Sequence, residues 1–208
     1  KLKCGKNETA IPYLHIYQSS SDNISMPDSA TPYIWLVADG SMRLHTPSGI
    51  MDYLPGQYSV SAIDTPIAGQ VLTRSEHQDF IAVSVSFTLD DAISVILDIE
   101  GNLTERIMQS DLDTEVMADF DKKVMESVLR LIKMQNHPEQ IAFSAKMVRK
   151  EMIFDVLCGT CGKQFMQSIT GIQQAGEIYR INSWIKKNYK ESFSVEDLAK
   201  LGNMSVSN

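Results

Sequence analysis

Hydrophobic residues recur at every second position through much of the first 87 residues, and Gly or Pro turns interrupt them at short intervals. Such alternation is typical of β-strands that bury one face. The strands that it predicts cover residues 11–17, 33–38, 41–45, 50–54, 57–62, 68–73 and 79–87. About seven or eight short strands at this spacing favour a sandwich or a closed barrel, because both protect the strand edges.

After Phe87 the hydrophobic period changes to 3.6 residues, which indicates helices. Thr88 and Asp91 have the spacing of a capping box, so a helix is expected to begin beside them. Two longer helices are predicted at about 114–134 and 139–157, and the second is apolar over much of its circumference, which predicts deep burial. The predicted fold class is α+β, with a β-domain at residues 1–87, a helical region at 88–172 and a last segment at 173–208.

The turn at Asp39-Gly40 lies between two predicted strands and has the sequence of a two-residue hairpin. The hairpin would pair Trp35 with Leu44 on a face that is nearly all apolar, and we expect that face, with Tyr58, to point into the barrel. Aromatic rings with a few polar atoms are what a small-molecule pocket uses. The candidate residues for an effector pocket are Tyr33, Trp35, Met42, Leu44 and Tyr58. An ordinary core uses the same residue types, and this alternative is at least as well supported residue by residue.

A second hypothesis is a constitutive interaction module whose barrel is solid and binds no effector. Ala82, Ser84 and Ser86 are small and would leave room for a ligand if they faced inward. The larger residues that alternate with them, Val83 and Val85, are expected to fill the interior instead, which favours the solid barrel.

The chain ends with the pattern of a capped helix followed by a tight turn. Ser194 is a good N-cap and Asp197 completes a capping box, so a helix is predicted from Ser194 to about Leu201. Gly202 and Asn203 tolerate the left-handed backbone that ends a helix. This spacing indicates the first half of a helix-turn-helix DNA reader, whereas an amphipathic helix with a frayed terminus explains the local pattern equally well.

The C-terminal stretch resembles the start of the DNA-binding domain of the AraC/XylS family of transcription regulators. The stretch is RINSWIKKNYKESFSVEDLAKLGNMSVSN, and the matching residues are Ile181, Trp184, Ile185, Asn188, Tyr189, 194–199 and 204–207. The family usually has Ala-Gly where this chain has Gly202-Asn203, a departure that the left-handed turn tolerates. The resemblance implies that the chain stops within the first of two helix-turn-helix units. The start of its incomplete recognition helix would then hold Ser205, Ser207 and Asn208.

The β half resembles the cupin-like N-terminal sensing domain of one AraC subgroup, on the string GSMRLHTPSGIMDYLPGQYSVSAIDTPIAGQV. The order of barrel, helices and truncated DNA reader makes the resemblance persuasive. It implies a regulator in which a small-molecule effector in a cupin-like β-barrel modulates operator binding by the mostly missing DNA-binding domain. The partners that it implies are operator DNA, bound only by the full-length protein, and an unidentified effector.

We also expect a homodimer, because two-fold operators favour regulators of the same symmetry. The hydrophobic stripe at residues 116–132 is a candidate interface, and packing of the same stripe on the barrel explains it equally well. The helical region would then both link the β-domain to the last segment and hold the two copies of the dimer together.

The composition permits this interpretation and limits others. At 208 residues, with 43% hydrophobic and 22% charged residues, the chain is expected to be a soluble globular protein. Its net charge of −7 argues against nucleic-acid binding by this fragment alone. Since no apolar run could span a membrane and no secretory leader is present, we expect a cytoplasmic protein with no membrane partner. The first residue is not Met, so the N-terminus is expected to be trimmed.

A metal-dependent cupin enzyme is the main rival. No two of the four histidines have ligand spacing; they are His15, His45, His77 and His137. Cys158 and Cys161 form a C-x-x-C pair, but no second pair exists, and the pair follows a predicted helix, whose end does not favour a reactive thiolate. We therefore expect no metal, no cofactor and no catalysis.

Overall fold

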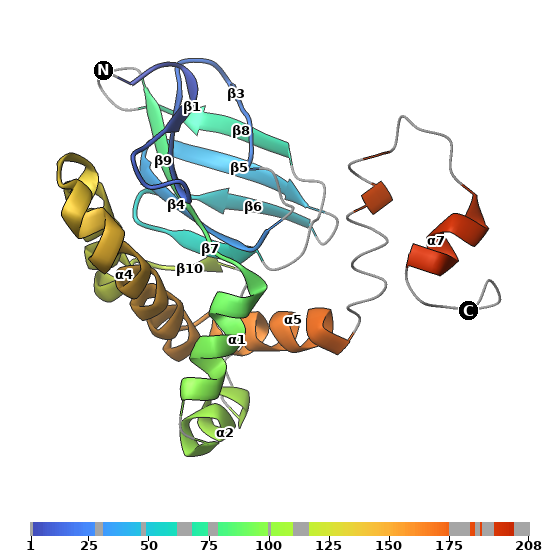
Figure 1. The fold of residues 1–208 in the computed structure, drawn as a ribbon. Helices are drawn as coiled ribbons and strands as arrows, with labels where there is room; N and C mark the ends of the chain where they lie inside the picture. The colour runs from blue at the N-terminus through green and yellow to red at the C-terminus, as the bar shows by residue number, and fades with distance from the viewer. Residues whose placement is uncertain are drawn as a thin grey trace. The chain divides into compact units, whose positions relative to one another are not determined.

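The fold is that of a computed structural model (Figure 1). It describes residues 2–27, 31–46, 49–61, 68–74, 79–99, 101–109, 117–174, 184–185, 188 and 194–201. The chain forms two compact units, Lys1–Met166 and Gln167–Asn208. None of the helices among the described residues has the length and apolarity that a membrane span requires.

The first unit contains two antiparallel sheets. Sheet A has the strand order β1 (Gly5–Glu8), β2 (Leu14–Ser19), β9 (Phe80–Ser86), β4 (Tyr33–Asp39), β7 (Tyr58–Ser61) and β10 (Met117–Ala118). Sheet B has the order β3 (Asn23–Ile24), β8 (Ala68–Thr73), β5 (Ser41–Thr46) and β6 (Gly49–Tyr53). The predicted strands are confirmed, although the first begins at Leu14 rather than Ile11. Among the described strands no pairing joins the two sheets, so the expected closed barrel is not what these strands form.

The turn at Asp39-Gly40 connects the two sheets and is not a hairpin. Strand β4 pairs with β7 and β9, whereas β5 pairs with β6 and β8, so the predicted pairing of Trp35 with Leu44 is wrong. Gly40 has φ +77°, and a Cβ there would lie 2.5 Å from the carbonyl oxygen of Thr73. Only glycine fits such a corner, and a tight-turn sequence alone does not distinguish a corner from a hairpin.

The hydrophobic core lies between the sheets. Trp35 is its largest residue and is 1% exposed. The Trp35 indole Nε1 donates to Met42 Sδ at 3.2 Å, across the two sheets. The Tyr17 ring meets the Trp35 ring edge-on, with 4.9 Å between centroids. The other buried members of this core are Ile24, Tyr33, Val37, Leu44, Tyr53, Val71, Phe80 and Ala82. The predicted apolar face therefore does point inward, because alternation sets the face of a residue whichever strand it pairs with.

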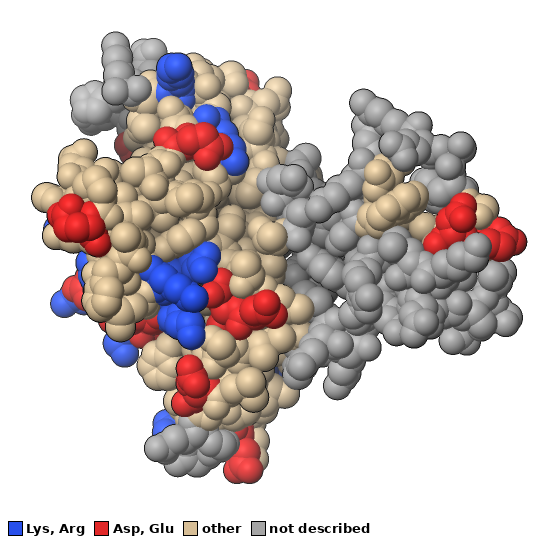
Figure 2. Space-filling view, in the orientation of Figure 1, with Lys and Arg blue, Asp and Glu red and all other residues tan. Residues whose placement is uncertain are grey.

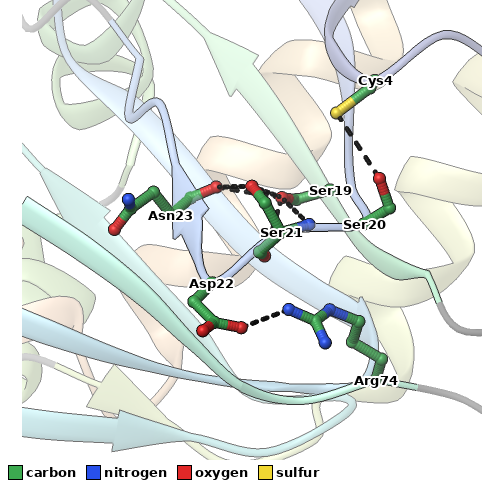
Figure 3. A network of polar contacts seen from close by, with 7 residues as sticks. All are labelled: Cys4, Ser19, Ser20, Ser21, Asp22, Asn23 and Arg74. Atoms are coloured by element: carbon green, nitrogen blue, oxygen red, sulfur yellow. Dashed lines mark hydrogen bonds and ion pairs between the residues drawn. The ribbon is translucent and has the colours of Figure 1, made fainter.

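The chain passes from sheet A to sheet B through a polar turn at residues 19–23 (Figure 3). The Ser19 hydroxyl lies 2.9 Å from the Asn23 carbonyl oxygen and accepts from the Ser21 amide at 3.2 Å. Asp22 forms an ion pair with Arg74, which follows the end of β8. These contacts fix β3 next to its partner β8.

The helices follow β9. Helix α1 (Leu89–Asp98) begins with the predicted capping box, in which the Asp91 amide donates to Thr88 Oγ1 at 3.1 Å and the Thr88 amide donates to Asp91 Oδ2 at 3.1 Å. The helices after it are α2 (Gly101–Gln109), α3 (Lys122–Lys133), the 3₁₀ turn η1 (Met134–Asn136), α4 (Pro138–Cys158) and α5 (Gly162–Gln174). The predicted α+β class is thus confirmed.

The helix predicted at 114–134 is wrong at residues 117–121. Residues Met117–Ala118 form strand β10, and α3 begins only after Asp121, whose Oδ1 accepts from the Lys123 amide at 2.8 Å. Phe120, which shares the 3.6-residue period, precedes the helix and is 61% exposed. The strong N-cap at Asp121 therefore sets the start of α3, although the apolar period begins before that residue.

Helices α3 and α4 pack on each other and on the outer face of sheet A (Figure 1). The Ala10 amide donates to Gln135 Oε1 at 2.7 Å, and a Cβ on Gly159 would lie 3.3 Å from the Tyr58 hydroxyl. The apolar outer-face residues Leu36 and Val83 are buried. The expected deep burial of this helix holds for one side only, because the side of α4 that faces away carries exposed apolar residues.

In the second unit, α7 (Val195–Leu201) confirms the predicted C-terminal helix. Its start has the expected capping box: the Asp197 amide donates to Ser194 Oγ at 3.1 Å, and the Ser194 amide donates to Asp197 Oδ2 at 3.1 Å. The candidate DNA-reading residues lie outside the described residues; they are Ser205, Ser207 and Asn208.

Candidate functional site

A cavity of about 570 Å³ lies where the β1–β2 edge of sheet A meets the start of α1 and the middle of α4. Ligand pockets have volumes of roughly 300–1,000 Å³. Its polar lining residues are Lys6, Glu8, Tyr13, His15, Thr31, Ser86, Thr88 and Arg149. Its apolar walls come from Pro12, Tyr17, Pro27 and Phe87. The cavity thus joins elements that are far apart in the sequence.

Strand register places the β1 and β2 residues of the cavity on the inner face of sheet A. Glu8 pairs with His15, which in turn pairs with Ser84, and Ser84 pairs with Trp35 of the core. Residues that pair directly across a sheet share one face. The cavity is therefore the continuation, at the β1 edge, of the face that forms the core.

A charged cluster occupies the β1 side of the cavity. Glu8 Oε1 lies 3.0 Å from Lys6 Nζ, and Glu8 Oε2 lies 3.0 Å from His15 Nε2. The hydrogen bond from Lys6 and the neighbouring positive charges hold the pKa of Glu8 below its usual value. Burial and the Lys6 charge lower the pKa of His15 more than Glu8 raises it, so His15 is neutral at neutral pH.

Arg149 of α4 forms the opposite wall. Its Nη2 lies 2.7 Å from Asp91 Oδ2, and the two side chains are only 13% and 9% exposed. Its guanidinium carbon lies 4.1 Å from the centroid of the Tyr13 ring, a cation–π contact. Although burial raises the pKa of Asp91, hydrogen bonds from Thr88 and the Arg149 charge outweigh it and hold that pKa below its usual value. Figure 2 shows Lys and Arg side chains over α4 beside Asp and Glu side chains over α1.

Residues 10–164 match the family model of the AraC-type transcriptional regulator N-terminus. The chain belongs to this family. The matched residues contain strands β2–β10 and helices α1–α4, which therefore form an AraC-type N-terminal domain. Membership of a family of transcription regulators agrees with the expectation that the chain is not an enzyme.

Solved structures resemble the AraC-type chain at low identity. ToxT from Vibrio cholerae, solved with an unsaturated fatty acid bound, is 10% identical with TM-score 0.47, and the match covers 93% of this chain and 87% of ToxT. The AraC-like activator CuxR is 10% identical with TM-score 0.41, covering 95% of this chain and 65% of CuxR. A cupin domain from Bordetella pertussis is 12% identical with TM-score 0.31, and the match covers 41% of this chain and 96% of the cupin domain. No curated protein matches the chain.

The residues predicted to line an effector pocket lie elsewhere in the AraC-type domain. Tyr33, Trp35, Met42 and Leu44 come together in the core, where each is at most 4% exposed. Tyr58 is also buried but pairs with Leu36, while its neighbour Ser59 pairs with Trp35. Tyr58 is therefore on the outer face, and the expectation that it joins the inner face is wrong. None of the five lines the cavity at the β1 edge.

The small residues of β9 have the opposite orientation to the one expected. Ala82 belongs to the core between the sheets and Ser84 pairs with Trp35, so both face inward, and both are 0% exposed. Val83 and Val85 point to the opposite face, because successive side chains alternate. Large rings from other strands, above all Trp35, fill the space that Ala82 and Ser84 leave.

The C-x-x-C pair lies at the end of α4. Cys158 is its last residue and is exposed, whereas Cys161 precedes α5 and is buried. Burial, followed by the charge of Asp155, raises the pKa of Cys158. A raised pKa disfavours the thiolate that redox chemistry requires.

Reasoning from the sequence missed the residues that line the cavity. Lys6, Glu8, His15 and Tyr17 alternate with other residues, and this spacing of two could have indicated a polar face on an edge hairpin. Arg149 had no such signal, because only the packing of α4 on the sheet brings it to Tyr13.

Proposed function

We propose that the first unit is the effector-sensing part of an AraC-type regulator, and that a small molecule bound in the cavity changes how the DNA-reading segment is presented to operator DNA. The cavity carries this proposal, because its lining comes from β1 and β2, from the β9–α1 junction and from α4. A ligand there would alter the contacts between the sheet and the helices. The proposed DNA contacts from Ser205, Ser207 and Asn208 rest on family resemblance.

A second candidate is a domain that binds no effector and acts only as an interaction module. The filled interior favours it, since Tyr33, Trp35, Met42 and Leu44 pack together in the core. An effector pocket among these four residues remains a prediction.

A thermal-shift screen of the 208-residue chain against a metabolite panel tests the proposal. A ligand present at 100 times its Kd should stabilise the fold by about 2.7 kcal/mol, which raises the melting temperature in a concentration-dependent way. A panel that yields no such compound would favour the module without an effector.

We further propose that the chain forms a homodimer through α4. Phe143, Met147 and Phe154 lie on one helical face and are 75%, 60% and 38% exposed. Exposed apolar stripes of this kind mark interfaces. The stripe at 116–132 is a poorer candidate, because its residues Val124 and Val128 are buried within the unit.

A second copy of the chain suits this face because the face is self-complementary. A cavity of about 450 Å³ lies beside Phe154: Val95, Ile99 and Leu103 form its apolar walls, and Asp98, Lys150 and Glu151 line it as well. Phe143 of a second copy could enter it, and the two-fold axis would repeat the contact in reverse. An aromatic anchor in an apolar pocket is typical of the residues that dominate binding energy.

Phe143→Glu should convert a dimer into a monomer, because it places a charge in the proposed apolar contact. We expect dimer dissociation to become at least about 30-fold easier, as for the loss of an anchor residue worth 2 kcal/mol. Sedimentation equilibrium measures this directly. Ile50→Glu is the control, since Ile50 is 63% exposed on β6 of sheet B and should have no effect. A wild-type chain that remains monomeric at high micromolar concentration would contradict the proposal.

A further inference from the structure

The lining of the cavity at the β1 edge carries more basic groups than acidic ones. Lys6, His15 and Arg149 have basic nitrogens, and among the described lining residues Glu8 is the one carboxylate. Asp91 offsets part of the Arg149 charge from outside the lining, through the 2.7 Å contact between Arg149 Nη2 and Asp91 Oδ2. Because His15 is neutral at neutral pH, the lining itself holds two positive charges, on Lys6 and Arg149, and one negative charge, on Glu8.

The wall formed by Arg149 and Tyr13 also contains polar groups that make no hydrogen bond within the described part of the chain. Arg149 Nε and the Tyr13 hydroxyl are shielded from water and have no hydrogen-bond partner within the described part of the chain. The two groups belong to one wall, because the Arg149 guanidinium stacks on the Tyr13 ring. A buried donor without an acceptor is unfavourable, so an oxygen atom that a ligand brings to this wall would stabilise it.

Lys6 can turn toward a ligand at little cost, whereas His15 already lies in the lining. The side chains of Lys6 and Glu8 are 45% and 68% exposed, and ion pairs at such exposed positions are weak. His15 lies beside the same carboxylate and is 11% exposed at its side chain, within the cavity lining. The Lys6 ammonium is therefore not committed to a strong contact that a ligand would have to break.

The remaining walls are apolar rings. Tyr17 and Phe87 line the cavity with Pro12 and Pro27, and a wall of rings favours a hydrocarbon body rather than a bare ion. We propose that the ligand of this cavity is a small organic acid, whose carboxylate binds at Arg149, Lys6 and His15 and whose apolar body packs on Tyr17 and Phe87. This inference rests on the proposed function, since it names the chemical class of the effector.

Matched acids and amides separate charge recognition from simple filling of the cavity. The probes are phenylacetate and octanoate, their amides, and inorganic phosphate, each added to the 208-residue chain at pH 7 in a thermal-shift assay. We expect at least one acid to raise the melting temperature with concentration, and its amide to have no effect, because a neutral amide forms no charge-assisted hydrogen bonds. Acids should also predominate among the hits from the metabolite panel.

Two variants locate the carboxylate. Arg149→Met should weaken binding of the acid at least about tenfold in a calorimetric titration, which is the loss of one hydrogen bond to a charged group. Lys6→Met should weaken it several-fold, and because Lys6 lies on the exposed edge strand β1 this variant remains informative if Arg149→Met fails to fold. Arg130→Met is the matched control: Arg130 pairs with Glu151 on the helix surface and binding should be unchanged.

The possible failures are distinguishable. Amides that bind as well as acids, or variants that bind like the wild type, would overturn the organic-acid ligand and leave the sensing function in place. Stabilisation by inorganic phosphate to the same extent as by the acids would also overturn it, because the apolar body would then contribute nothing. If neither the probes nor any panel compound stabilises the chain, both the ligand class and the sensing function fail.

Discussion

Trp35→Ala should lower the free energy of unfolding by about 3–5 kcal/mol, the range for removing a large aromatic residue from a core. Trp35 is 1% exposed, meets Tyr17 edge-on and donates to Met42 across the two sheets. The loss removes contacts with both sheets at once. Urea denaturation followed by circular dichroism measures the change.

Trp35→Phe is the matched control, because it keeps an aromatic ring and loses the donor to Met42 Sδ. It should destabilise by about 1–2 kcal/mol, as expected for a smaller cavity and one lost hydrogen bond. A loss below about 1 kcal/mol in Trp35→Ala would mean that the sheets do not pack around this side chain. The size of the expected loss also makes Trp35→Ala unsuitable as a ligand-binding control, since its unfolding would hide any effect on affinity.

Asp91→Ala should destabilise the chain by about 3–5 kcal/mol at pH 7, because it leaves the Arg149 guanidinium nearly buried without its carboxylate partner. The same change removes the capping box at the start of α1. Urea denaturation again gives the magnitude. Asp90→Ala is the control: the neighbouring carboxylate is exposed in the same first turn, and its loss should cost less than about 1 kcal/mol.

The contribution of Asp91 should depend on pH in a defined direction. Its pKa is lower in the folded chain than in the unfolded chain, so the carboxylate stabilises the fold above the unfolded-state value of about 4. That stabilisation is lost as the pH falls through the lower folded-state pKa. The difference between wild type and Asp91→Ala should therefore be complete at pH 7 and shrink below about pH 4. If the stability difference between wild type and Asp91→Ala were the same at pH 7 and below about pH 4, packing rather than charge would account for that difference.

The β-strands and helix caps could be predicted because their signals are local. Alternation gave the inward face of Trp35 correctly, and the Thr88–Asp91 and Ser194–Asp197 spacings gave two helix starts. Strand partners were not predictable in this way. The Asp39-Gly40 turn has the sequence of a hairpin, yet it joins strands of different sheets: β4 belongs to sheet A and β5 to sheet B.

The candidate site was harder to predict than the fold. The alternation around Tyr58 predicts one inward and one outward set of residues, but alternation alone does not say which of the two sets faces in. The cavity depends on Tyr13 and Arg149, which only tertiary packing brings into contact. Polar residues at an edge strand, such as Lys6 and Glu8, are explained equally well by solvent exposure, so their pattern gives no reason to choose them.

The corner at Gly40 has a consequence for how quickly the domain folds. Because β4 turns away from β5, its neighbours are β7 and β9, and Tyr33 pairs with Ser86 near the far end of the β region. Strand β2 also depends on β9 for its pairing within the sheet, since Leu14 pairs with Val85. Domains dominated by such distant pairings fold in roughly milliseconds to seconds, much slower than helical bundles. During synthesis, sheet A cannot form its centre until β9 has emerged, so a nascent chain that ends before Phe80 exposes unpaired strand edges.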